Sequence, residues 1–192
     1  MGDFNMLINM DDISALNLKT TFKHIGKNVL ISDKAVFYGT ENISIGDNSR
    51  IDDFAILSAG DEGIHIGRYV HIACHTAIIG KGKVTLHDYS GISSRVAIYS
   101  SSDNYDGIWM TNPCVPESVR KTYHKPVWIG QHVVVGTGST ILPGVTLEDG
   151  CAVGAMTLVN NSFPINSIIV GIPGKRVKER KYTIYDLEET LK

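Results

Sequence analysis

Aliphatic residues recur along this chain at about every sixth position. The phrase Ile-Gly-x, with another aliphatic residue six positions after its isoleucine, occurs first as Ile25-Gly26-Lys27 followed by Ile31. Five related copies begin at Ile45, Ile66, Leu86, Ile129 and Leu147. A third apolar column follows about six residues further on and comprises Phe37, Leu57, Ile78, Ile98, Ile141 and Leu158. The repeating unit is therefore three groups of about six residues.

A spacing of six does not fit the two ordinary secondary-structure patterns. A helix face needs apolar residues three and four apart, and a single strand alternates every two residues. The pattern fits three short strands per turn, with each coil hydrogen-bonded to the coils above and below at ~4.8 Å. Ile and Val suit buried pleated columns, and Gly, Asn and Asp suit corners that need a positive φ. The repeat predicts an all-β fold, a parallel β-helix shaped as a triangular prism, rather than a β-sandwich.

Three segments interrupt the repeat between its first and last copies. The glycine-rich stretches 58–63 and 80–83 hold surplus residues, and they predict small loops at corners of the prism. Residues 100–126 form a much longer insertion that contains three prolines. A loop of that length in a tight solenoid indicates a functional role.

The two ends of the chain lie outside the repeat. Residues 1–24 predict an N-terminal capping segment, in which Asp11-Asp12 is a possible start of a short helix. The β-helix domain is expected over 25–177. In the remaining segment, 178–192, Ile184, Leu187 and Leu191 stand at helical spacing and predict a C-terminal helix.

Composition narrows the classes of partner and compartment. The net charge of -2 gives no overall basic field that would recruit nucleic acid. The three cysteines show no paired or metal-type spacing, and no secretory signal is evident at the N-terminus. No apolar run approaches the roughly 18 residues that a membrane span needs. We therefore expect a cytoplasmic protein that binds no nucleic acid and has no membrane span.

The last coils resemble a known family. Residues 128–145 read WIGQHVVVGTGSTILPGV, residues 153–160 read VGAMTLVN, and residues 170–177 read VGIPGKRV. These stretches resemble the hexapeptide-repeat acyltransferases, in the branch of the galactoside, maltose and streptogramin acetyltransferases. Within that branch the chain looks like the sugar acetyltransferases of surface-polysaccharide pathways. The resemblance, which covers about residues 25–180, implies a left-handed β-helix, a hand that composition alone does not fix.

The resemblance also implies a reaction and an assembly. It implies acetyl-CoA as co-substrate, O- or N-acetylation of a sugar or nucleotide-linked sugar, and a homotrimer with active sites between subunits. Small corner residues would keep backbone groups within reach of the pantetheine chain, and a tail lysine would contact phosphate or pantetheine. The cofactor-binding residues expected on this basis are Gly136, Thr137, Gly154, Ala155, Asn160, Gly171, Pro173 and Lys175.

The catalytic base is the point at which the chain departs from this branch. Acetyl transfer needs a base for the attacking group, and the resembling enzymes carry a histidine at the start of the long loop. The register of the repeat places Asp103 or Asn104 there. The first hypothesis is that His71, outward because Ile72 points inward, is the base and Asp103 orients it. The second is that Asp103 itself is the base for an aminosugar, and the third is a non-catalytic scaffold or binding module.

Other polar residues complete the candidate site. His75, on the same coil as His71, and Asn104 and Tyr105 in the long loop are expected to bind the acceptor. His124, just before the end of that loop, is the reserve candidate for the base.

A metalloenzyme is the remaining alternative. The γ-class carbonic anhydrases share this type of fold, and His71, His75 and His87 suggest their zinc triad. The His-x3-His spacing differs from the pattern of that class, and the acyl-CoA tail is present. We therefore expect no metal.

Overall fold

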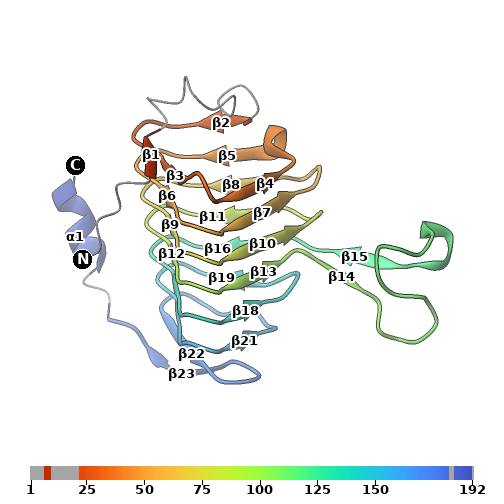
Figure 1. The fold of residues 1–192 in the computed structure, drawn as a ribbon. Helices are drawn as coiled ribbons and strands as arrows, with labels where there is room; N and C mark the ends of the chain where they lie inside the picture. The colour runs from red at the N-terminus through yellow and green to blue at the C-terminus, as the bar shows by residue number, and fades with distance from the viewer. Residues whose placement is uncertain (1–6, 10–21, 182–183, 192) are drawn as a thin grey trace.

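The structure, a computed structural model, describes residues 7–9, 22–181 and 184–191, and most of its regular elements are β-strands. The chain winds into a stack of coils whose axis runs from the level of β2 to that of β22 and β23 (Figure 1). Three sheets, A, B and C, form the sides of the prism, and each of the first six coils contributes one strand to each sheet in the order B, A, C. The predicted left-handed parallel β-helix is confirmed.

Sheet A is the largest side. Its seven parallel strands in the described residues are β3 (Leu30–Ser32), β6 (Arg50–Ile51), β9 (His71–Ile72), β12 (Gly91–Ile92), β17 (Val134–Val135), β20 (Ala152–Val153) and β22 (Ser167–Val170). Antiparallel strands cover both of its edges, β1 (Leu7–Asn9) beside β3 and β23 (Lys175–Glu179) beside β22. The edge strands of this sheet are therefore β1 and β23 rather than strands of the parallel coils.

Sheets B and C are the other two sides. Sheet B comprises β2 (His24–Ile25), β5 (Ile43–Ile45), β8 (Ile64–Ile66), β11 (Val84–Leu86), β16 (Val127–Ile129) and β19 (Thr146–Leu147). Sheet C comprises β4 (Val36–Tyr38), β7 (Ile56–Ala59), β10 (Ala77–Gly80), β13 (Ala97–Tyr99), β18 (Thr140–Ile141) and β21 (Leu158–Val159). A 3-10 turn, η2 (Thr40–Asn42), joins β4 of sheet C to β5 of sheet B.

The inward columns form one continuous aliphatic core. Ile72, Ile78 and Leu86 are fully buried, and most of their equivalents in the other coils are buried as well, whereas Ile25 and Phe37 of the first coil are partly buried. One predicted member is corrected: Val159, not Leu158, pairs with Ile141 and is completely buried. Val159 stands six residues after the inward Val153, whereas Leu158 stands five after it, so the six-residue rule itself identifies the inward position.

The structure also adds a seventh coil to the six that the repeat predicted. Ile169 on β22 pairs with Val153 and is fully buried. The coil was not recognised because it begins Phe163-Pro164-Ile165 in place of Ile-Gly-x.

The long loop leaves the prism where sheet C turns into sheet B. Its first and last segments pair as the hairpin β14 (Ser101–Asp103) and β15 (Thr122–His124), and η3 (Glu117–Val119) lies between them. Figure 1 shows this loop projecting far from the stacked coils. Within residues 22–181, the prism therefore carries one large extension, which is rooted at a single corner.

The C-terminal segment folds in two parts. Residues 175–179 form β23, and the helix expected over 178–192 is confined to α1 (Ile184–Glu188) and the 3-10 turn η4 (Glu189–Leu191). Glu188 fastens it to the prism by accepting hydrogen bonds from His132 Nε2 at 2.8 Å and Gln131 Nε2 at 3.1 Å. None of the helices in the described part of the chain has the length and apolarity that a membrane crossing requires. The helix expected near Asp11-Asp12 lies outside the described residues.

Contact between adjacent coils predicts how two glycines respond to the same substitution. A Cβ at Gly46 would come within 2.7 Å of the backbone of Gly67 in the next coil, whereas a Cβ at Gly91 would meet nothing within 4 Å. We expect Gly46→Ala to lower the free energy of unfolding by about 1–3 kcal/mol through overpacking. Gly91→Ala should change it by about 0.5 kcal/mol or less, or raise it slightly. Guanidinium denaturation of both variants tests this, and equal effects would refute the role of coil spacing.

Candidate active site

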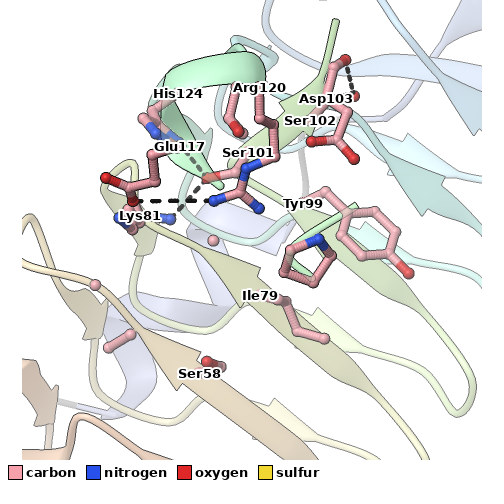
Figure 2. A pocket seen from close by; sticks show the side chains of 15 residues that line it. Ser58, Ile79, Lys81, Tyr99, Ser101, Ser102, Asp103, Glu117, Arg120 and His124 are labelled. Atoms are coloured by element: carbon pink, nitrogen blue, oxygen red, sulfur yellow. Dashed lines mark hydrogen bonds and ion pairs between the residues drawn. The ribbon is translucent and has the colours of Figure 1, made fainter. Parts of the chain in front are cut away.

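A cavity of about 970 Å³ lies between the outer face of sheet C and the base of the long loop. Ile79 and Tyr99 form its apolar floor, and Ser58 and Gly60 line its edge. Its polar lining includes Lys81, Ser101, Asp103, Glu117, Arg120 and His124. Figure 2 shows these polar side chains gathered around one side of the cavity. The volume is within the range of small-molecule sites.

A short chain of hydrogen bonds orients His124 in this cavity. The backbone N–H of Lys81 donates to Ser101 Oγ at 2.7 Å, and the same Oγ lies 2.7 Å from His124 Nδ1. Because the amide occupies a lone pair of Oγ, the hydroxyl proton can be donated to Nδ1. That arrangement puts the proton of a neutral imidazole on Nε2 and makes His124 a hydrogen-bond donor there.

Asp103 lines the same cavity from the end of β14. Its Oδ2 accepts a hydrogen bond of 3.0 Å from the backbone N–H of Asn112, which fixes the carboxylate across the base of the loop. The side chain of Asn104 turns into the loop instead and accepts from the backbone N–H of Asp106 at 2.9 Å. Tyr105 is 82% exposed and is not among the lining residues. Of the three expected loop residues, only Asp103 faces the cavity.

His71 lies on a different side of the prism. It stands on β9 of sheet A and points outward, as its sequence position predicted, with Ile72 fully buried beside it. Its Nε2 donates to Asp52 Oδ2 at 2.9 Å, and Asp52 Oδ1 accepts from Arg50 Nε at 2.6 Å. The carboxylate that orients His71 within one chain is therefore Asp52 on the preceding coil, and Asp103 is on a separate surface.

His75 occupies the corner between sheets A and C. Its ring stacks on the ring of Phe54 at a centroid distance of 5.0 Å. Lys34 Nζ lies 5.8 Å from the centroid of the Phe54 ring. Beside this stack, hydrogen bonds from Ser32 and then from Lys34 lower the pKa of Asp53. The corner thus carries aromatic and charged groups outside the cavity that holds Asp103.

Most of the expected cofactor-binding residues follow one edge of the prism. Gly136, Gly154 and Gly171 begin the corners after β17, β20 and β22. The exposed members of the set along this edge are Thr137, Ala155, Gly171, Pro173 and Lys175. Asn160 lies on another corner, after β21. These exposed small residues and the exposed Lys175 fit an elongated ligand with phosphate groups.

Coil stacking gives a further reason for two of these glycines. A Cβ at Gly136 would come within 2.6 Å of the backbone of Ala155, and one at Gly154 would meet Val170 at 2.8 Å. Their N–H groups donate to Val153 and Ile169 at 2.8 Å. Close packing between coils therefore explains these two glycines without a ligand.

The histidines do not assemble a metal site in the described residues, where no cluster of three or more potential ligands occurs. His87 instead packs its ring against Trp128 at 4.1 Å. His71 bonds to Asp52 and His75 stacks on Phe54, so each of the three histidines has a different partner.

Several lining residues were missed by sequence reasoning. Lys81, Ser101 and Tyr99 lie next to the loop root, and Arg120 and Glu117 lie within the loop. The surplus residues at 80–83 predicted a small loop at that corner, and the length of the insertion 100–126 indicated a functional role. Neither feature of the sequence predicts which side chains line the cavity on sheet C.

Comparisons with known proteins agree with this architecture. The family profile "Bacterial transferase hexapeptide (six repeats)" matches residues 126–161. The chain is 51% identical over 171 residues to dTDP-4-amino-4,6-dideoxy-D-glucose acyltransferase of Escherichia coli, covering 89% of each chain. It is 32% identical to the putative lipopolysaccharide biosynthesis O-acetyl transferase WbbJ of Escherichia coli K12, covering 77% of this chain and 74% of that protein.

A solved structure matches almost the whole length. A variant of AntD, an N-acyltransferase from Bacillus cereus, in complex with dTDP-4-amino-4,6-dideoxyglucose and coenzyme A, superposes with a TM-score of 0.89 and is 38% identical over 97% of each chain. The predicted family and enzyme class are confirmed. The chain belongs to the hexapeptide-repeat acyltransferases, and among them to the enzymes that acylate sugars.

Proposed function

We propose that this enzyme transfers the acyl group of acetyl-CoA, or of a related acyl-CoA, to the amino group of a dTDP-linked 4-amino-4,6-dideoxyhexose. The observation that carries this proposal is the full-length likeness to AntD, which was solved with such a nucleotide sugar and coenzyme A. The Escherichia coli relative, named for the same class of acceptor, supports it. The sequence left open whether an oxygen or a nitrogen of the sugar is acylated, and this proposal selects the nitrogen.

The chemistry of the cavity suits an amine. The neutral amine attacks the thioester carbonyl to form a C–N bond, the tetrahedral intermediate collapses, and the CoA thiolate leaves as the nitrogen gives up one proton. We assign Asp103 as the group that holds the amine and accepts that proton. His124, with Ser101 on its Nδ1, is placed to donate from Nε2 to the developing oxyanion.

We further propose a homotrimer whose sites are shared between subunits. Tyr105, Ile108 and Met110 in the projecting loop are more than half exposed, and the outer face of sheet C exposes Val36 and Ile56 as well. Apolar surface of this extent indicates contact with another protein surface. If the loop of one subunit reaches sheet A of the next, Asp103 and the His71–Asp52 pair face one cleft, and His75 lies near its rim.

The pathway and compartment follow from the substrates. A deoxyaminosugar carried on dTDP is an activated building block, and WbbJ is named for lipopolysaccharide biosynthesis. We therefore propose a role in surface-polysaccharide biosynthesis in the cytoplasm, where acyl-CoA is available.

Asp103→Asn tests the assignment of the proton acceptor. We expect kcat/KM for a dTDP-4-amino-4,6-dideoxyhexose to fall by about 10²–10⁴-fold because the amide cannot take up the proton. Thiol release measures the turnover, and calorimetry should show CoA affinity unchanged within about twofold. Asp106→Asn, in the same loop, is the matched control and should retain activity. Near-normal turnover of Asp103→Asn would remove Asp103 from the mechanism.

Mixed oligomers test the shared site. His71→Ala and Asp103→Asn are each expected to leave little activity as pure oligomers. After subunits are mixed at equal ratio and reassembled, a site between neighbours contains both intact residues in about one quarter of cases, so about a quarter of wild-type activity should return. Activity that stays at the mean of the two parents would show that no site combines residues from two subunits.

A further inference from the structure

The outer face of sheet B carries a second cleft, of about 360 Å³, away from the catalytic cavity. It is lined by Lys83, Thr85, Pro126, Trp128, Thr146 and Glu148. These residues come from or adjoin β11, β16 and β19, which are stacked in Figure 1. The C-terminal end of the long loop lies between the catalytic cavity and this cleft, because His124 lines the cavity and Pro126 lines the cleft.

An exposed indole dominates the cleft. Trp128 points outward from β16 and is 42% exposed. His87 lies against it at a centroid distance of 4.1 Å with the planes tilted by 42°. His87 stands where four of the other repeats carry the glycine of Ile-Gly-x. In this coil the imidazole of His87 therefore takes the place of a glycine and packs against the indole of Trp128. The exposed part of that indole forms a broad apolar surface, which we call the platform.

Four polar side chains surround this platform. Within the described residues, the side chains of Lys83, Thr85, Thr146 and Glu148 make no hydrogen bond or ion pair. Together they offer two hydroxyls, one ammonium and one carboxylate, so donors and acceptors are both available. Their charges cancel, which favours a neutral ligand rich in hydroxyl groups over a phosphate.

His65 strengthens this preference. It stands on β8, where it pairs in register with Thr85 of the next coil. Its pKa is lowered by burial and also by His87 and Lys83. The imidazole is therefore neutral at pH 7 and adds no positive charge to the face.

We propose that this cleft binds a pyranose ring of a neutral saccharide, with one face of the sugar against Trp128 and its hydroxyls on Thr85, Thr146, Lys83 and Glu148. Its volume is at the lower end of the ligand-site range, about 300–1,000 Å³, which suits one sugar ring. The site goes beyond the proposed transfer reaction and does not depend on it.

Fluorescence titration tests the proposal in a chain whose only tryptophan is Trp128. The sequence has two tryptophans, so Trp109→Phe leaves that single reporter. The probes are methyl α-D-glucopyranoside, methyl α-D-galactopyranoside and methyl α-L-rhamnopyranoside. We expect saturable binding of at least one glycoside in the millimolar range, and Thr146→Val in the same background should weaken it by about fivefold or more. In the otherwise unchanged chain, Trp128→Ala should abolish the ligand-detected NMR signal.

Three results would overturn the site. These are no saturable change with any glycoside up to about 50 mM, equal affinity in the Thr146→Val variant, or binding of dTDP at this cleft as strong as that of the glycosides. Acyl transfer is assayed in parallel, and Trp128→Ala should retain it. A failure of the proposed reaction would leave the titration unchanged, so the two proposals are tested separately.

Discussion

Backbone contact between neighbouring coils is the constraint on which the rest of the structure depends. Each coil hydrogen-bonds to the next along all three sheets, and at Gly46 and Gly136 there is no room for a Cβ between one coil and the next. Inside the coils, the aliphatic columns form one buried cluster along the prism. Neither the stacking direction nor the interior can vary, so chemistry is confined to outward side chains and to corners that can lengthen.

The corner between sheets C and B is the corner that is lengthened in this chain. Surplus residues gather there in the coils that contain 60–63 and 80–83, and the loop 100–126 extends the same corner in the coil that follows. Because the coils are in register, Lys81 of one coil reaches Ser101 of the next and through it His124. The cavity beside the loop is thus built by stacking irregular corners upon one another rather than by a single motif.

The sequence predicted those features that the repeat encodes and missed those that depend on individual side-chain contacts. The six-residue period gave the fold, the inward columns and the outward direction of His71, and it would have given Val159 if counted strictly from Val153. The pairing of His71 with Asp52, 19 residues earlier, depends on which rotamers meet across two coils. The position of Arg120 and Glu117 at the lining of the cavity depends on the path of a loop that has no repeat. Periodicity carries no information on either.

The missing loop histidine is best understood through the atom that is acylated. A hydroxyl must lose most of its proton before it is an effective nucleophile, whereas a neutral amine attacks first and releases its proton as the C–N bond forms. A positioned carboxylate such as Asp103 can receive that proton without the intrinsic basicity that an alcohol demands. The replacement of histidine by aspartate at the start of the loop is therefore an argument for nitrogen as the acceptor atom, and it agrees with the N-acyltransferase that this chain resembles along its whole length.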